Sequence, residues 1–187
     1  RSQLMKCWGR NSDYQLGYSD NNHRGHAVDT MGDKLPTLNL GTESKVLQIN
    51  IGSLYTCVIR IDYELRCWGD NGSGVLGFGT SKASIPTSSP EFVAVKVDSD
   101  TTKKVKYVST GYEHTCALLD DDISTKCVGI NGNGQLGQGD NTNRGNSPSN
   151  TMDTFIAINL GTGALKIKSI NAGGAYTCVV FEDSTVK

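Results

Sequence analysis

Cysteine is the residue type whose spacing in this sequence most clearly implies chemistry. Six cysteines occur among the 187 residues. Cys57 and Cys67 are ten residues apart, and Cys116 and Cys127 are eleven residues apart. Facing positions on a β-hairpin place Cα atoms roughly 4.5 to 5.5 Å apart, a separation that a disulfide can span. We therefore predict one disulfide within each pair.

Two other interpretations of these cysteines stay open at this stage. Zinc sites usually space their chelating cysteines about two to four residues apart, which this sequence does not do. Reduced cysteines could instead fill the core as small apolar side chains. Cys7 and Cys178 have no partner at hairpin spacing. We expect these two to link neighbouring units or to close the two ends, in one molecule or between molecules.

The remaining reactive side chains do not form a recognisable catalytic set. The three histidines are scattered, and His114 stands where the repeat otherwise has Tyr55 and Tyr176, which indicates packing rather than acid–base chemistry. No aspartate cluster matches an EF-hand loop, and no glycine-rich stretch ends in the Gly-Lys-Ser of a phosphate loop. We expect a protein that is not an enzyme and that has no catalytic residue, metal site or cofactor.

The segments that carry these residues recur with a period of sixty residues. A Cys-Trp-Gly motif occurs three times, as Cys7-Trp8-Gly9, Cys67-Trp68-Gly69 and Cys127-Val128-Gly129. A second motif places a glycine five residues before a Thr-Cys cysteine, at Gly52, Gly111 and Gly173. A fixed internal period indicates a repeat architecture. We predict a single repeat domain over residues 1–187, with units 7–66, 67–126 and 127–187, incomplete at both ends.

Short strands and glycine-rich turns are expected within each unit. Alternating or short apolar runs rich in β-formers predict strands at 46–51, 56–59, 105–108, 115–119, 167–170 and 177–181. Glycine and asparagine at 69–74 and 129–134 accept positive φ and mark tight turns. The fold class is therefore all-β, and four strands per repeat favour β-propeller blades of antiparallel sheets over a sandwich. About three such repeats would belong to a larger propeller or assembly.

These motifs resemble the repeat of the regulator-of-chromosome-condensation family, over essentially the whole chain. The family's hallmark segments are similar to His114-Thr115-Cys116-Ala117-Leu118 and to residues 127–139. Val128 stands where the family has Trp, and Tyr14 and Val75 interrupt its Gly-Gln in the other copies. The resemblance implies a propeller, often of about seven blades, that binds proteins through loops at one face or rim. Functions differ widely among such proteins, so the fold alone does not fix the function.

Charge, hydropathy and cysteine usage narrow the class of function. A net charge of -1 provides no field that would attract nucleic acid. No apolar run approaches the roughly 18 residues of a membrane-spanning helix. Paired cysteines indicate a secreted or extracellular protein, because disulfides do not persist in a reducing cytosol. We predict a non-enzymatic extracellular structural or adhesive module, in a larger or filamentous assembly. The alternative is a protein-binding regulator or inhibitor, such as an enzyme inhibitor or a small-GTPase exchange factor.

Two kinds of surface residue are predicted to serve these functions. Aromatic loop residues that could anchor a protein partner, or simply pack within a blade, are Tyr18, Tyr63, Phe78 and Tyr112. Asn71 begins the sequon Asn71-Gly72-Ser73 in a turn that we expect to be exposed, so it is the candidate site for an N-linked glycan. The expected partners are proteins, either copies of the chain itself or further blades, and not nucleic acid or membrane.

Overall fold

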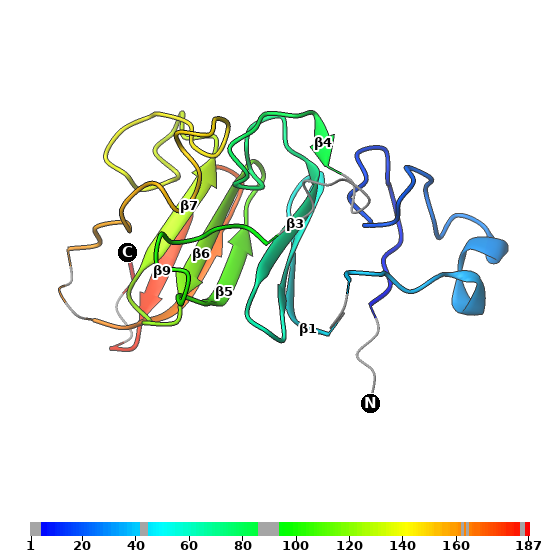
Figure 1. The fold of residues 1–187 in the computed structure, drawn as a ribbon, viewed down its shortest axis with the longest axis horizontal. Helices are drawn as coiled ribbons and strands as arrows, with labels where there is room; N and C mark the ends of the chain where they lie inside the picture. Colours follow the sequence, from blue (N-terminus) through cyan, green and yellow to red (C-terminus); the bar gives the residue numbers. More distant parts are fainter. Residues whose placement is uncertain (1–4, 42–44, 86–93, 162, 164, 184–185) are drawn as a thin grey trace.

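The fold is all-β, with three antiparallel sheets that lie side by side (Figure 1). A computed structural model describes residues 5–41, 45–85, 94–161, 163, 165–183 and 186–187. Within these residues the only helices are two short 3₁₀ turns, Val28–Thr30 and Gly32–Lys34. No helix in the described ranges is long or apolar enough to cross a membrane.

Each sheet is a meander of short strands. The first sheet has the order β1-β2-β3-β4, with β1 at Val46–Ile51, β2 at Tyr55–Arg60, β3 at Leu65–Asp70 and β4 at Ser84–Ile85. The second contains β5 at Val105–Thr110, β6 at His114–Leu119 and β7 at Thr125–Gly129. The third contains β8 at Ile167–Ala172 and β9 at Thr177–Phe181. The predicted strands are confirmed, with ends that differ by at most two residues.

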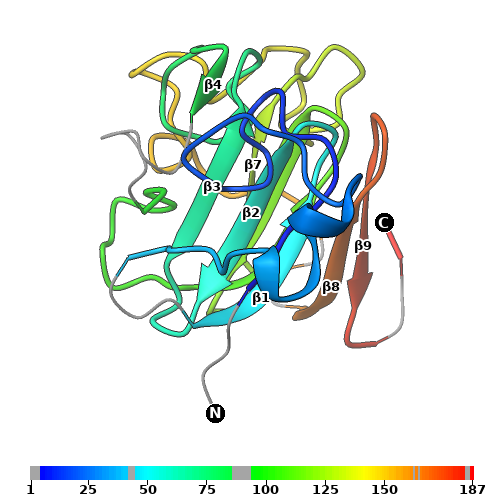
Figure 2. The same cartoon turned by 90° about the vertical axis from the view of Figure 1, so that its right-hand side faces the viewer.

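Residues 5–41, which we call the N-terminal segment, contain a backbone pairing that also occurs at the outer edge of the second sheet. Gly9 forms an antiparallel bridge with Arg24, and Gly129 forms the same bridge with Arg144, two sequence periods later. Figure 2 shows this segment lying across the face of the first sheet. Its leucines pack there against Val58 and Trp68. The segment therefore holds the position of the sheet that would precede the first one.

The sheets do not coincide with the predicted sequence units. In the first sheet Cys57 of β2 lies opposite Cys67 of β3, so the end of unit 7–66 pairs with the beginning of unit 67–126. Cys116 and Cys127 join the next two units in the same way. Units 7–66, 67–126 and 127–187 remain a prediction about the sequence period. The first and second sheets each combine strands from two of these units, whereas the two strands of the third sheet lie within unit 127–187.

The core lies between the sheets. One apolar cluster joins the first and second sheets, and another joins the second and third. Strand β5 contacts β1 and β2 on one side and β8 on the other. Each fully buried large apolar side chain contributes roughly 1.5 to 3 kcal/mol. Because the apolar faces of the sheets meet one another, a sheet depends on its neighbours for its stability.

Candidate functional site

Both predicted disulfides are present. Cys57 is bonded to Cys67 and Cys116 to Cys127, with Cα atoms 4.1 Å apart in each pair. All four side chains are buried between sheets. The bridges therefore lie inside the blades as structural links and present no reactive sulfur at the surface.

Cys7 and Cys178 are free thiols in the described part of the chain. Cys7 is half-buried, and burial raises its pKa to about 11, whereas Cys178 is exposed. The N-terminal segment and β9 lie at opposite ends of the molecule (Figure 1). The two cysteines are therefore not bonded to each other in this structure, and their predicted role in linking units or closing the ends stays a prediction.

A buried asparagine fastens the glycine-rich turn of each repeat. The side-chain oxygens of Asn11, Asn71 and Asn131 accept backbone N–H bonds from Leu16, Leu76 and Leu136 at 2.9, 3.0 and 2.9 Å. Their amide nitrogens donate to the carbonyls of Asp20, Thr80 and Asp140 at 2.7, 2.8 and 2.9 Å. Asn71 is fully buried. The expectation that Asn71 is exposed is therefore wrong, and the predicted glycan has no support from the structure, because the Asn71 amide is already bonded inside the fold.

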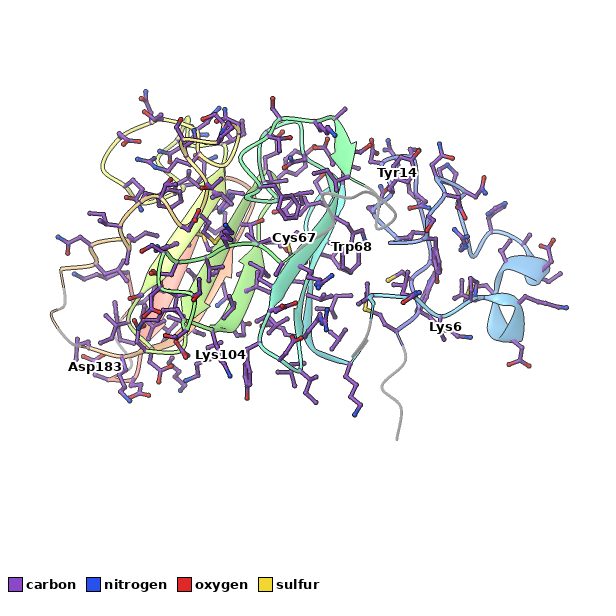
Figure 3. All side chains as sticks on the ribbon, in the orientation of Figure 1. Lys6, Tyr14, Cys67, Trp68, Lys104 and Asp183 are labelled. Atoms are coloured by element: carbon purple, nitrogen blue, oxygen red, sulfur yellow. A yellow bond between two sulfur atoms is a disulfide. The ribbon has the colours of Figure 1, made fainter. Side chains whose placement is uncertain are left out.

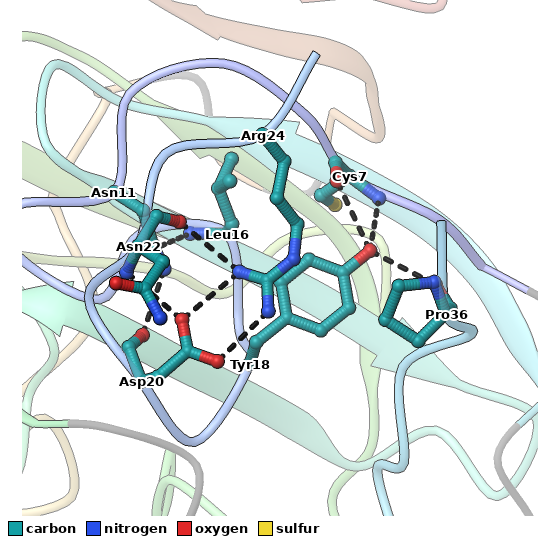
Figure 4. A network of polar contacts seen from close by, with 8 residues as sticks. All are labelled: Cys7, Asn11, Leu16, Tyr18, Asp20, Asn22, Arg24 and Pro36. Atoms are coloured by element: carbon teal, nitrogen blue, oxygen red, sulfur yellow. Dashed lines mark hydrogen bonds and ion pairs between the residues drawn. The ribbon is translucent and has the colours of Figure 1, made fainter. Parts of the chain in front are cut away.

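Tyr18 is a packing residue of the N-terminal segment (Figure 4). Its side chain is buried, and its hydroxyl lies 3.0 Å from the carbonyl oxygens of both Cys7 and Pro36. The Arg24 guanidinium covers its ring at 3.8 Å and pairs with Asp20 at 2.8 Å. The hydrogen bond from Arg24 lowers the pKa of Asp20. Of the two interpretations of Tyr18, an anchor for a protein partner or packing within a blade, the structure therefore supports packing.

The other three predicted aromatic anchors differ in exposure. Phe78 is partly buried and packs against the core between the first and second sheets, so it is not a free anchor. Tyr63 is 45% exposed, with the Lys104 ammonium 5.1 Å from its ring, and Tyr112 is 62% exposed. Tyr63 lies in the β2–β3 turn beside the start of β5, whereas Tyr112 lies beyond the end of β5. The two exposed tyrosines therefore belong to opposite ends of the sheets.

An aromatic residue of one sheet reaches a threonine of the next. The Tyr55 hydroxyl lies 2.6 Å from the His114 carbonyl and accepts a bond from the Thr115 hydroxyl at 3.1 Å. His114 repeats the contact with Thr177, at 2.9 Å from Nε2 to the hydroxyl. We call this contact the aromatic–threonine contact. The sequence predicted only a packing role for the aromatic residue before Thr-Cys. The structure shows that this residue also connects one sheet to the next.

The motif glycine makes room for this contact. A Cβ on Gly52 would collide with the Tyr55 ring, and a Cβ on Gly111 would collide with the His114 ring. Tyr176 holds the same position in the third sheet, above Gly173, and is 64% exposed. The described residues contain no fourth sheet for Tyr176 to contact.

The tryptophan of the Cys-Trp-Gly motif packs on the preceding repeat. Trp68 is buried, and its indole N–H donates to the Gln15 carbonyl at 3.1 Å. It points from the first sheet toward the N-terminal segment (Figure 3). A Cβ on Gly17 would lie 2.8 Å from the indole nitrogen, so this position requires glycine. Trp8, the equivalent residue one period earlier, is 61% exposed.

An apolar groove opens beside Trp8. It has a volume of about 590 Å³ and runs between the N-terminal segment and β1. Its lining includes Cys7, Trp8, Leu16, Ile49, Ile51 and Leu54. We call it the N-terminal groove. The sequence analysis did not predict this groove. The available signal was Trp8, an apolar residue in the first copy of a motif whose second copy, Trp68, packs on the preceding repeat.

Metal-ligating side chains do not gather at one place in the described ranges. These ranges contain no cluster of three or more His, Cys, Asp or Glu side chains with suitable geometry. The candidate functional surfaces are therefore the exposed Tyr112 loop and the open faces at the two ends of the row of sheets.

Comparisons with known proteins agree with this geometry. Residues 65–118 match the family model described as the regulator of chromosome condensation (RCC1) repeat. The mouse protein named probable E3 ubiquitin-protein ligase HERC4 is 29% identical over 153 residues, which is 81% of this chain and 13% of the ligase. The Arabidopsis thaliana ultraviolet-B receptor UVR8 is 30% identical over 133 residues, which is 70% of this chain and 28% of the receptor.

A solved structure supports the same fold. The crystal structure of Prp20p from Saccharomyces cerevisiae superposes with a TM-score of 0.65 at 19% identity, over 91% of this chain and 37% of Prp20p. The chain thus spans well under half the length of each of these relatives. Its sheets, its period and these matches agree: the chain is built from regulator of chromosome condensation (RCC1) repeats that fold as β-propeller blades.

Proposed function

We propose that the chain is a non-catalytic protein-binding module whose main contact residue is Tyr112. Large aromatic side chains supply much of the binding energy at protein interfaces when they are presented on a rigid support. The crystal structure of Prp20p is described together with its binding to Gsp1p and histones, so this type of propeller can bind proteins. The exposed side chain of Tyr112 is the observation that carries the proposal.

The position of Tyr112 favours binding because its backbone is fixed. The Tyr112 amide lies 3.1 and 3.3 Å from the carbonyls of Gly173 and Gly174 in the next sheet. The ring is nevertheless 62% exposed. A fixed backbone reduces the conformational entropy that is lost when a partner covers the ring.

The experiment is a binding screen in which secreted and cell-surface proteins are tested for capture by the immobilised chain. Partners captured by the wild type should be lost or weakened at least about tenfold by Tyr112→Ala, as expected for an anchor residue. Tyr63→Ala is the matched control, because Tyr63 is also exposed but lies at the opposite end of the sheets. Equal capture by wild type and Tyr112→Ala would contradict the proposal.

We further propose that the module works outside the cell or in another oxidising compartment. Two buried disulfides support this location, because such bonds are not maintained by cytosolic thiol systems. The test is the mass of the protein isolated from its natural source and alkylated without reduction. Alkylation of all six cysteines would contradict the location and would favour an intracellular regulator.

A structural or adhesive role in a larger assembly is the second candidate function. The exposed Trp8 at one end of the row of sheets and the exposed Tyr176 at the other end favour it. Exposed aromatic residues at positions that are buried elsewhere in the repeat mark surfaces suited to association. Light scattering on the purified chain tests this role: a mass that rises with concentration supports assembly, and a constant monomer mass contradicts it.

A further inference from the structure

The connection between the first and second sheets encloses a pocket. Residues 95–105 are tied at both ends to the β2–β3 turn: the Val95 amide donates to the Leu65 carbonyl at 2.8 Å, and the Val105 amide to the Tyr63 carbonyl at 3.3 Å. Between these two bonds lies a pocket of about 500 Å³. This volume falls in the range of roughly 300 to 1,000 Å³ that small-molecule sites have. We call it the connector pocket.

Ion pairs to the second sheet hold the wall of the connector pocket in place. The buried Lys126 ammonium of β7 lies 2.9 Å from Asp98, and Lys103 pairs with Asp121 at 3.0 Å. Asp98 and Lys103 both line the pocket. A site whose wall is already fixed costs less conformational entropy to occupy.

The same connection in the next sheet forms a smaller and uncharged pocket. Residues 158–167 are tied at both ends by equivalent backbone bonds, to the carbonyls of Thr125 and Asp122. This connection has ten residues, against eleven in 95–105. Its pocket has a volume of about 160 Å³, and the described residues that line it carry no charged side chain. The connector pocket is therefore not a general feature of the repeat.

Tyr63 lines the connector pocket at a position where tyrosine is conformationally costly. Its φ is 66°, in the left-handed region that side chains with a Cβ disfavour. The equivalent residue of the second sheet is Asp122, with a φ of 63°, and aspartate and asparagine enter this region more readily. Strained residues of this kind cluster at functional sites. The turn does not require tyrosine here, so its half-exposed ring points to a role in the pocket.

The carboxylates that line the pocket already have partners. Each accepts an ion pair or a hydrogen bond: Asp62 from Arg60 at 2.9 Å, Glu64 from Arg66 at 3.1 Å, Asp98 from Lys126 at 2.9 Å and Asp100 from the Thr102 hydroxyl at 2.7 Å. Three of these four negative charges are thus balanced by a cation.

Two lysines of the lining are available for an anion. Lys96 and Lys104 are both exposed, and within the part of the chain that the structure describes neither has a carboxylate at ion-pair distance. Lys104 lies just before β5 (Figure 3), with its ammonium 5.1 Å from the centre of the Tyr63 ring. An ammonium that is free of carboxylates can donate charge-assisted hydrogen bonds to an anionic ligand.

We propose that the connector pocket binds a small aromatic carboxylate. The ligand's ring lies between the Tyr63 side chain and the apolar wall, and its carboxylate accepts hydrogen bonds from Lys96 and Lys104. The apolar wall consists of the buried side chains Leu65, Val95, Val97 and Val105. Aromatic pairs and burial against aliphatic side chains favour a flat ring there. The site is independent of the Tyr112 surface, which lies at the other end of the sheets.

The test is a titration of the ¹⁵N-labelled full chain with 2-naphthoate, followed by NMR. We expect saturable shifts of backbone amides at 62–65 and 94–105, with a Kd of about 1 mM or tighter. The neutral isostere 2-naphthamide should bind at least about fivefold more weakly, because it cannot pair with the lysines. Acetate, which has the charge without the ring, should give no saturable shifts.

Substitutions separate the contributions of charge and ring. Lys96→Gln with Lys104→Gln should weaken 2-naphthoate binding about tenfold and leave 2-naphthamide binding unchanged. Lys168→Gln, at an exposed lysine outside the pocket, is the matched control and should have no effect. Tyr63→Asn should also weaken binding about tenfold. Because asparagine tolerates the left-handed region, this variant should unfold at the same urea concentration as the wild type or a higher one.

Several outcomes would overturn the proposal. These are no saturable binding of 2-naphthoate, shifts that gather at the N-terminal groove, equal affinity for the acid and the amide, or unchanged binding by Tyr63→Asn. Easier unfolding of Tyr63→Asn would also count against it, because it would make Tyr63 a residue of the turn. Loss of protein capture by Tyr112→Ala leaves the proposal intact, so the two proposals fail separately.

Discussion

At the scale of single residues, equivalent positions of the repeat have unlike surroundings. Tyr14, Gly74 and Gly134 share one position in the turn and adopt φ values of 63°, 74° and 78°. A Cβ on Gly74 would lie 2.5 Å from the Asn146 nitrogen, whereas a Cβ on Gly134 would meet nothing within 4 Å. Backbone conformation alone therefore cannot explain the cost of a side chain at this position.

Gly74→Ala should destabilise the fold more than Gly134→Ala. Both changes place a Cβ in the left-handed region, at a cost of about 1 to 2 kcal/mol. Gly74→Ala should cost a further 1 to 3 kcal/mol, roughly, because the backbone at Asn146 must move. Urea unfolding of the two variants measures the difference, and equal free energies of unfolding would contradict the close packing of the two loops.

Asn71→Ala should lower the free energy of unfolding by about 2 to 4 kcal/mol. The change leaves the Leu76 amide and the Thr80 carbonyl without their partner inside the fold. Ser73→Ala is the control, because it destroys the sequon and leaves the buried amide in place. Expression in cells that attach N-linked glycans should give the unglycosylated mass for both wild type and Ser73→Ala.

The contrast between the cysteines and Asn71 shows what a single sequence can reveal. Hairpin spacing predicted both disulfides, because residues ten or eleven apart on a short hairpin face each other whatever surrounds them. The exposure of Asn71 could not be predicted from its sequon, because its burial depends on backbone groups at Leu76 and Thr80 that close the turn around it. The choice between anchor and packing for Tyr18 could not be made from the sequence for the same reason, since it depends on the contacts of Tyr18 with Arg24 and Pro36.

At the scale of strands and sheets, each junction combines an apolar core with one polar contact. The strands themselves were predictable from their apolar pattern. The register between sheets was not, because it depends on pairs such as Tyr55 with Thr115 and His114 with Thr177 that are about sixty residues apart. Only a comparison of the three repeats could suggest that these positions share a role.

His114 should make stability depend on pH, and His114→Tyr should remove that dependence. Burial lowers the pKa of His114, so below about pH 6.5 the unfolded chain binds a proton that the folded chain does not. The stability that the neutral His114 side chain allows is therefore fully present above about pH 6.5, and the free energy of unfolding falls as the pH drops below it. Tyrosine is the residue that the repeat itself uses at this position, above the same glycine.

The measurement compares wild type and His114→Tyr by urea unfolding at pH 8 and at pH 5. The loss of stability between the two pH values should be larger for the wild type. An identical loss in both proteins would mean that His114 does not titrate differently in the folded and unfolded chains.

Removing the disulfide of the first sheet should cost roughly 2 to 3 kcal/mol, the chain entropy of a loop of about ten residues. The change is Cys57→Ala with Cys67→Ala, and Cys116→Ala with Cys127→Ala is the matched variant in the second sheet. Both should unfold at lower urea than the wild type, by similar amounts, because their loops differ by one residue. A cost confined to one sheet would contradict this loop-based account.

At the scale of the whole molecule, the row of sheets ends in two different thiols. Alkylation of the folded, unreduced chain should modify two cysteines, Cys178 and Cys7, and six after reduction and unfolding. Cys178 should react first because it is exposed. Cys7 should react slowly, because burial raises its pKa to about 11 and only the thiolate is a good nucleophile. Equal rates measured by mass spectrometry would contradict the burial of Cys7.

The position of the disulfides also determines what happens when the chain is cut. Each bridge crosses the turn between two strands, at residues 61–64 in the first sheet and 120–124 in the second. A protease that cleaves both turns would produce three peptides that sulfur still holds together. Such a nicked protein would keep its shape through many encounters with proteases, and would come apart only when it entered a reducing environment.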